Sequence, residues 1–215
     1  MMNDTSAKIA QYLLECEAVK LNVDEPFTWT SGMRSPIYCD NRVTLSYPTI
    51  RQYITNELVK VILQHFGNVE AIAGVATAGI AQGALIADKM NLPFAYVRPE
   101  PKKHGLKNSI EGRLETGAKV VVVEDLISTG KSSLKAVEDL RENGIEVIGL
   151  VSIFNYGFAA ADQKFKDTNC HYISLSNFNA LAEVAIQTNY ITNLQAEKIA
   201  MWSKDPQAWS DQIGA

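Results

Sequence analysis

The feature that most constrains the fold is a run of four consecutive valines, Val120 to Val123, inside a predicted strand over residues 119–123. An unbroken apolar run suits a strand covered on both faces, as in parallel sheets. Strands alternate with helices around it, which predicts an α/β fold with a central parallel sheet, flanking helices and right-handed crossovers. The predicted strands cover residues 71–75, 94–97, 119–123, 147–154 and 172–175, and the predicted helices residues 80–90 and 131–143.

The N-terminal part predicts two amphipathic helices separated by short strands. The first helix starts at Asp4 or Thr5, and its inward stripe contains Ile9, Leu13, Cys16 and Lys20. Residues 27–30 and 37–40 are predicted strands on either side of a turn at Ser31 and Gly32. The second helix opens at Ser46, Tyr47 and Pro48, and its apolar stripe contains Ile50, Ile54, Leu58, Ile62 and His65.

Composition excludes several classes of protein. The chain has 215 residues, 47% of them hydrophobic, which is enough for one sizeable core. A net charge of −4 disfavours a nucleic-acid partner, and no apolar run approaches the roughly 20 residues of a membrane helix. Three widely spaced cysteines predict neither a disulfide framework nor a zinc cluster. Because the N-terminal helix also lacks the pattern of a secretion signal, we expect a cytoplasmic protein.

Residues 98–116 break the alternation of strands and helices. The stretch has no convincing period, and it contains Arg98, Lys102, Lys103, His104 and Lys107. A loop of this length inside a compact domain is usually functional or disordered. A solvated basic loop is the simpler interpretation, but cations on a closing loop also neutralise a leaving anion and exclude water. We therefore interpret the segment as a long mobile lid.

The most informative motif is V-V-V-V-E-D-L-I-S-T-G-K-S-S, which covers residues 120–133. Two carboxylates, Glu124 and Asp125, follow the valines, and a turn rich in hydroxyls and glycine leads into a helix. Ligands bind at the carboxyl ends of parallel strands, and a helix N-terminus attracts phosphate. Carboxylates suit ribose hydroxyls or a Mg²⁺ ion shared with them. Two alternatives remain, an ordinary capped turn and a Walker A loop, although Asp125 stands where Walker A requires glycine.

This motif resembles the signature of type I phosphoribosyltransferases, which bind 5-phosphoribosyl 1-diphosphate (PRPP). The resemblance implies the type I fold, with an N-terminal hood and a mobile catalytic loop. It also implies that Glu124 and Asp125 hold the ribose hydroxyls, and that a Mg²⁺ cofactor is held mainly by PRPP, with Asp125 as the protein group that adds to it. The implied PRPP-binding residues of the motif are Glu124, Asp125, Leu126, Ile127, Ser128, Thr129, Gly130, Lys131 and Ser132.

The lid run R-P-E-P-K-K-H-G is similar to the catalytic loop of the orotate phosphoribosyltransferase family. The similarity implies that Arg98, Lys102, Lys103 and His104 bind PRPP, and that Lys102 and His104 are catalytic. It further implies a homodimer in which each loop closes over the neighbouring subunit's site. Many members carry lysine where this chain has Pro99.

A third loop lies between a predicted strand and a predicted helix, at Gly74-Val75-Ala76-Thr77-Ala78-Gly79. Tight strand-to-helix turns commonly use glycine, so the pattern alone is weak. In the family, the equivalent loop binds diphosphate through its backbone, which assigns Thr77, Ala78 and Gly79 to that role. Many orotate enzymes carry lysine at the position of Ala78.

The choice of base rests on F-T-W-T-S-G-M-R-S-P-I-Y, residues 27–38, which resembles the orotate family's F-x-x-x-S-G-x-x-S-P-x-Y. The alternative is a plain hairpin. The resemblance places the segment in a hood over the base, with Tyr38 against the flat ring and Ser35 and Arg34 near its polar edge. Thr30 replaces a common lysine, and Tyr156 stands near a position where some relatives use arginine for the orotate carboxylate. Ser128 is therefore a further expected orotate contact.

We accordingly expect one phosphoribosyltransferase domain over residues 1–215, with a hood mainly in residues 1–45, a core over about 46–180 and C-terminal helices over 181–215. The expected reaction joins PRPP and orotate to give orotidine 5′-phosphate and diphosphate, without nucleic-acid or membrane partners. Two alternatives stay open, a purine phosphoribosyltransferase and a PRPP-sensing regulator. We interpret the remaining singletons as structural: His65, Cys170, His171, Trp202 and Trp209.

Overall fold

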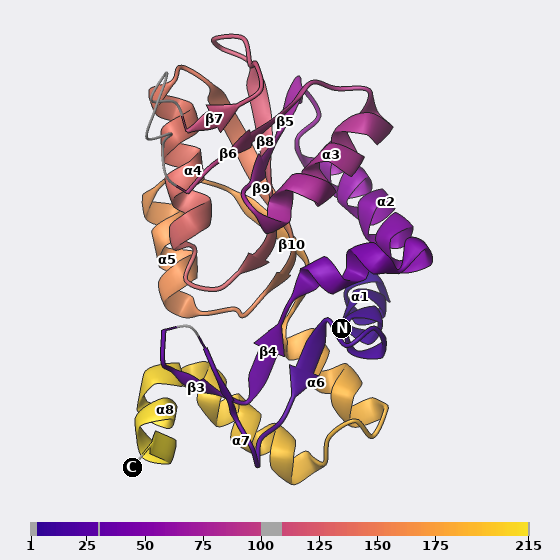
Figure 1. Cartoon of the computed structure of the whole chain (residues 1–215), viewed down its shortest axis with the longest axis vertical. Helices are drawn as coiled ribbons and strands as arrows, with labels where there is room; N and C mark the ends of the chain where they lie inside the picture. The colour runs from indigo at the N-terminus through magenta and orange to yellow at the C-terminus, as the bar shows by residue number, and fades with distance from the viewer. Residues whose placement is uncertain (1–3, 30, 100–108, 215) are drawn as a thin grey trace.

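A six-stranded sheet forms the centre of the computed structural model, which describes residues 4–29, 31–99 and 109–214 (Figure 1). The strand order is β10-β9-β8-β5-β6-β7, and all neighbours run parallel except β7, which is antiparallel to β6. The α/β prediction is therefore confirmed. The strands are β5 (Ala71–Val75), β6 (Phe94–Val97), β7 (Ile110–Glu111), β8 (Lys119–Ile127), β9 (Glu146–Asn155) and β10 (Tyr172–Asn177).

The valine run is explained by the two hydrophobic cores on either side of β8. Successive side chains of a strand point to opposite faces of the sheet. Val121 and Val123 pack into one core, whereas Val120 and Val122 pack into the other, and all four are fully buried. A strand with two covered faces has no position that favours a polar residue, so the sequence shows no alternation here.

Helices cover both faces of the sheet (Figure 1). One face carries α1 (Asp4–Glu15), α2 (Pro48–His65) and α3 (Ala78–Met90), and the opposite face carries α4 (Lys131–Glu142) and α5 (Ala159–Asp167). The predicted stripe of α2 is confirmed for Ile54, Leu58 and Ile62, which are fully buried, while His65 is exposed. Three further helices complete the chain, α6 (Phe178–Gln187), α7 (Asn193–Lys204) and α8 (Pro206–Gly214).

The hood differs from the single hairpin that we predicted. β1 (Val19–Leu21) pairs with β4 (Ile37–Cys39), and β2 (Phe27–Thr28) pairs with β3 (Arg34–Ser35). Lys20 lies in β1 and not on the first helix, because Glu17 adopts a left-handed φ of 56° after α1 and ends it. The first helix packs on β10 and α6, so the hood strands begin after it.

The C-terminal helices hold the hood against the sheet. Trp202 of α7 is fully buried, and its ring lies 6.0 Å from Trp29 of the hood and 5.7 Å from Tyr156 at the end of β9. The backbone N–H of Arg34 in β3 donates to Ser210 Oγ of α8 at 2.8 Å. Figure 1 shows α7 and α8 running beneath the hood strands. The interpretation of Trp202 as a structural residue fits this packing.

The irregular segment is shorter than the predicted lid of residues 98–116. Tyr96 and Val97 pair with β7, and the N–H of Arg98 donates to the carbonyl of Ser109 at 2.8 Å. The predicted strand over residues 94–97 therefore has an antiparallel partner, β7, inside the segment that we assigned to the lid. Lys102, Lys103, His104 and Lys107 lie outside the described residues.

None of the helices that the structure describes combines the length and the hydrophobicity needed to cross a membrane.

Candidate active site

The strand order creates a crevice between β5 and β8. These two strands are neighbours, and from them the chain winds outward in opposite directions, through β6 and β7 on one side and through β9 and β10 on the other. Ligands of open α/β sheets bind at such a switch point, outside the carboxyl ends of the strands. The motif of residues 120–133 and the loop of residues 74–79 both lie at this edge.

The acidic pair lies within β8 and not beyond its end, which corrects our expectation. Glu124 is only 4% exposed, and its two carboxylate oxygens accept hydrogen bonds from Ser133 Oγ at 3.0 Å and from the Asp125 N–H at 3.1 Å. Asp125 is half-buried. Asp125 is therefore more accessible to a ligand in the crevice than Glu124, which faces α4.

Both carboxyl groups are poised for a partner that supplies hydrogen atoms or positive charge. Burial raises the pKa of Glu124 well above its usual range, and the neighbouring charge of Asp125 adds to this effect. Burial also raises the pKa of Asp125, although a hydrogen bond with Glu124 opposes the change. Sugar hydroxyls or a cation would stabilise the ionised pair, whereas a bare anion would not.

The turn before α4 has the geometry of an anion site. Gly130 is the N-cap residue, with a φ of 73° and no capping side chain, so the first N–H groups of the helix lack an intrahelical partner. A Cβ atom at Gly130 would meet the ring of Phe165 at 2.8 Å. Thr129, Lys131 and Ser132 are exposed beside this helix end and Ser128 is half-buried.

Leu126 and Ile127 do not share one environment, although we assigned both to the PRPP site. Leu126 is half-buried and lines a cavity under the hood. Ile127 is 1% exposed, and its side chain belongs to the core beneath α4. Its carbonyl accepts the N–H of Tyr156 at 3.0 Å. The Ile127 side chain therefore packs away from the crevice, and the assignment of Ile127 to PRPP stays a prediction.

A second uncapped helix end lies beside the first. Thr77 is the N-cap residue of α3 without a side-chain cap, and the bend before it contains a cis peptide bond between Ala76 and Thr77. Thr77 is exposed, Ala78 is half-buried and Gly79 is buried. A Cβ atom at Gly79 would lie 2.4 Å from the Val123 carbonyl oxygen, so glycine allows α3 to approach β8. Two helix N-termini thus face one crevice.

Cations line a cavity of about 370 Å³ between these helix ends and β6. Arg98 is one of them, and its guanidinium also pairs with Glu111 of β7 at 3.3 Å. Pro99, the last described residue before the gap, lies on the same wall. The complete lining is Val75, Ala76, Val97, Arg98, Pro99, Thr129, Lys131, Ser132, Lys135 and Ala136.

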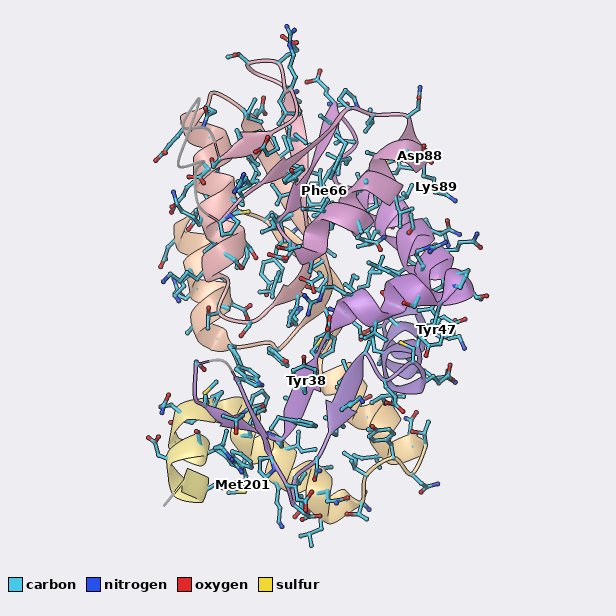
Figure 2. All side chains as sticks on the ribbon, in the orientation of Figure 1. Tyr38, Tyr47, Phe66, Asp88, Lys89 and Met201 are labelled. Atoms are coloured by element: carbon cyan, nitrogen blue, oxygen red, sulfur yellow. The ribbon has the colours of Figure 1, made fainter. Side chains whose placement is uncertain are left out.

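An aromatic cavity of about 430 Å³ lies between the hood and the end of β8. Tyr38 and Ser128, two of the four residues that we expected near orotate, line it, and Figure 2 places Tyr38 where the hood meets the core. The other two, Ser35 and Arg34, are not among its lining residues. Ser35 is fully buried, and its hydroxyl donates to the Ile37 carbonyl and accepts the Ile37 N–H. The cavity is lined by Thr28, Trp29, Ser31, Met33, Tyr38, Cys39, Leu126, Ser128, Thr129 and Tyr156.

Sequence reasoning missed Asn41, which ties the hood to the acidic pair. It lies at the start of η1 (Asn41–Ser46), is 2% exposed, and donates from Nδ2 to the Asp125 carbonyl at 2.8 Å. Trp29 and Cys39 of the aromatic cavity were missed as well. The only signal was the polar run Asp40-Asn41-Arg42 directly after the hood motif, because local sequence does not show which distant strand a side chain will reach.

A further cavity, of about 540 Å³, is remote from this edge. It lies between the end of α5 and the start of β10, beside Asp162, Cys170 and His171. The amino end of β10 borders it, so it does not open on the crevice between β5 and β8.

Comparison with known proteins agrees with this geometry. The family model described as "Phosphoribosyl transferase domain" matches residues 48–189. The orotate phosphoribosyltransferase of Bacteroides fragilis is 53% identical over 97% of this chain and 98% of its own length. The structure of orotate phosphoribosyltransferase from Aeropyrum pernix superposes with a TM-score of 0.73 and 29% identity, covering 86% of this chain and 99% of that one. Leishmania donovani UMP synthase gives a TM-score of 0.78 at 28% identity, over 92% of this chain and 42% of that longer protein.

Proposed function

The chain belongs to the orotate phosphoribosyltransferase family, and on that premise we propose how its residues carry out the family's reaction. The reaction transfers ribose 5-phosphate from PRPP to orotate, and it yields orotidine 5′-phosphate and diphosphate for pyrimidine biosynthesis. The observation that carries the assignment of the site is one arrangement: two uncapped helix N-termini and the half-buried Asp125 of β8 occur together at the β5–β8 switch point.

PRPP fits this crevice in one orientation. The 5′-phosphate takes the N-terminus of α4, where Ser128, Thr129 and Ser132 supply hydroxyl groups. The diphosphate takes the N-terminus of α3 and the cavity that Arg98 and Lys131 line. The ribose hydroxyls then lie at Asp125, with Glu124 behind it. Each charged part of PRPP meets a group of opposite polarity, which supports the placement.

The base occupies the aromatic cavity, beside Tyr38 and Ser128. When the C1–O bond of PRPP breaks, positive charge grows on the ribose and negative charge on the diphosphate. Asp125 stabilises the positive charge on the ribose, and Arg98 and Lys131 stabilise the negative charge on the diphosphate. We assign Lys102, Lys103 and His104 to the diphosphate too, with Lys102 and His104 as the catalytic groups. The segment that carries them leaves and rejoins the fold beside Arg98.

We propose that Mg²⁺ binds together with PRPP. Among residues 4–29, 31–99 and 109–214, no group of three or more histidine, cysteine or acidic side chains is placed to hold a metal ion. Asp125 is the accessible carboxylate of the crevice, and it suits a hard cation that is otherwise held by phosphate oxygens. When bound, Mg²⁺ supplies charge stabilisation to the diphosphate. We also propose a cytoplasmic homodimer that shares the catalytic loop, as the family resemblance implies.

The function is tested by one assay series. Diphosphate release from PRPP is measured with orotate, uracil, adenine, hypoxanthine and xanthine, and PRPP binding is measured by calorimetry. We expect release with orotate alone. Release with a purine and not with orotate would refute the assignment of the base, and PRPP binding without release for any base would indicate a regulator.

The placement of PRPP is tested by Asp125→Asn, which keeps the shape of the side chain and removes its charge. Hydrogen bonds to a charged group contribute about 1.5–3 kcal/mol, so we expect PRPP to bind at least about tenfold more weakly. Asp88→Asn is the matched control, because Asp88 is exposed at the far end of α3 (Figure 2). Equal PRPP affinity for both variants would remove Asp125 from the ribose site.

A further inference from the structure

A buried asparagine lies where the hood meets the end of β8. Asn41 is 2% exposed, and it follows shortly after β4, the hood strand that carries Tyr38. Its main chain is fixed on both sides. The Asp40 N–H donates to the Ala18 carbonyl at 2.7 Å, which ties the preceding residue to the hood. Thr44 Oγ1 donates to the carbonyl of Asn41 itself at 2.6 Å. The Asn41 side chain therefore starts from a backbone position that the fold determines.

The side-chain amide of Asn41 has a partner at each of its polar atoms. Nδ2 donates to the Asp125 carbonyl at 2.8 Å, and Oδ1 accepts from Cys39 Sγ at 3.5 Å. A backbone carbonyl only accepts hydrogen bonds, so these partners allow one orientation of the amide. Cys39 lines the aromatic cavity, whereas Asp125 is the half-buried carboxylate of the crevice. One amide group thus connects the wall of the aromatic cavity to the residue that we place at the ribose.

The strand end that carries Asp125 has lost one of its neighbours. The pairing of β8 with β5 ends at Val123, opposite Gly74, whereas the pairing with β9 continues to Ile127. The hydrogen bond from Asn41 reaches this strand end across 84 positions of the sequence. It is therefore a tertiary restraint on the backbone of Asp125, and it comes from the segment that follows the hood strands.

The transfer reaction depends on the distance between the two sites that Asn41 connects. In the proposed placement, the aromatic cavity holds the base and Asp125 holds the ribose hydroxyls. The new glycosidic bond joins a ring nitrogen of orotate to C1 of the ribose, so the reacting atoms belong to ligands that different parts of the chain hold. A misplacement of about 1 Å can lower the rate of such a reaction about 100-fold. A direct hydrogen bond between the two parts of the chain limits this displacement.

We propose that Asn41 is a positioning residue, which holds the hood at a fixed distance from Asp125 so that orotate and the ribose of PRPP meet in the reactive geometry. This inference rests on the proposed function, which places the base in the aromatic cavity and the ribose at Asp125. Asn41 acts through Asp125 and Cys39, because its side chain is buried and both of its polar atoms are occupied. Loss of the amide should therefore slow the transfer step more than it weakens the binding of either substrate.

The test is Asn41→Ala, which removes the amide and keeps every residue that lines the two cavities. Diphosphate release is measured in a single turnover, PRPP affinity by calorimetry and the KM for orotate by steady-state assay, with the melting temperature as the check of folding. We expect the single-turnover rate to fall about tenfold or more, because alignment is lost, while PRPP affinity and the KM for orotate change by less than about threefold.

Asn143→Ala is the matched control. Asn143 Nδ2 donates to the Asp139 carbonyl at 2.7 Å, so the same kind of hydrogen bond is lost, but at the C-terminal end of α4 and away from the crevice. We expect its single-turnover rate, PRPP affinity and KM for orotate to stay within about twofold of the parent values, since the residue is exposed.

Two results would overturn the proposal. One is a parent-like rate in folded Asn41→Ala. The other is a loss of rate that an equal loss of PRPP affinity accompanies, because Asn41 would then only shape the ribose site. Asn41→Ser also lacks the amide but leaves a smaller cavity, and it gives the same readouts if the alanine variant does not fold. If the parent enzyme releases no diphosphate with orotate, the proposed function fails instead, so the two failures are distinguishable.

Discussion

At the scale of single residues, the site depends on side chains held in environments that they would avoid without a ligand. Glu124 is nearly enclosed, with one hydroxyl and one N–H as partners, and burial raises its pKa well above the usual range. An ionised Glu124 therefore lowers the stability of the ligand-free protein. Destabilised groups of this kind concentrate at functional sites.

Glu124→Gln tests how much the burial of Glu124 lowers the stability of the folded protein, because this effect depends on pH. Because the folded-state pKa of Glu124 is raised, its contribution to stability is fully present below the ordinary glutamate pKa and is lost as pH rises through the raised pKa. Glutamine does not ionise, so we expect the variant to gain melting temperature relative to the parent between pH 5 and pH 8, by a few degrees. Calorimetric scans without ligand measure the difference.

The control for this prediction is Glu138→Gln, because Glu138 is exposed on the same side of the fold in α4. Its melting temperature should follow that of the parent at every pH. A Glu124→Gln variant whose stability difference from the parent does not change with pH would show that Glu124 is not penalised by its burial.

At the scale of elements, two helices begin at the crevice without capping side chains. The usual Ser, Thr, Asp or Asn cap satisfies one of the free N–H groups, and such a cap would compete with a bound phosphate. Thr77 stands at the cap position of α3 but its hydroxyl does not bond the helix, and Gly130 has no side chain at all. The helices thus give up about 1 kcal/mol of local stability each and keep their N–H groups available for anions.

Gly130→Ala tests how strongly this turn requires glycine. The substituted Cβ atom would sit at a positive φ and 2.8 Å from Phe165, so we expect the free energy of unfolding to fall by about 1–3 kcal/mol and PRPP binding to weaken. Gly117→Ala is the comparison, because Gly117 has a φ of 82° and nothing within 4 Å of its Cβ position. Urea unfolding measures both. Equal losses would mean that contact with Phe165 adds nothing.

At the scale of the whole molecule, the aromatic cavity is assembled from three distant parts of the chain. The hood supplies Trp29 and Tyr38, the strand ends supply Leu126 and Tyr156, and α7 supplies Trp202 behind them. Asn41 fixes the hood to the Asp125 carbonyl. The C-terminal helices, which carry no motif, therefore support the geometry of the aromatic cavity from behind.

Trp202→Ala should lower the free energy of unfolding by about 3–5 kcal/mol, because it replaces a fully buried aromatic ring with a cavity. We also expect weaker orotate binding, since Trp29 and Tyr156 lose their common support. Met201→Ala is the control: Met201 is the neighbouring residue, is 62% exposed (Figure 2), and should cost no more than about 0.5 kcal/mol. Chemical denaturation and fluorescence titration give the two readouts, and full stability of Trp202→Ala would contradict the role of this cluster.

The sequence by itself determined the elements and the chemistry that follows from local pattern. Four valines predicted a strand with two covered faces, and the acidic pair before a glycine turn predicted a site for a phosphorylated sugar. The tertiary structure alone decided which residues meet. It placed β5 beside β8, buried Ser35 and Ile127 away from the ligand cavities, and brought Asn41 and Trp202 to the site. The physical reason is that periodicity and turn chemistry act over a few residues, whereas strand order and burial depend on contacts between segments that are far apart in the sequence.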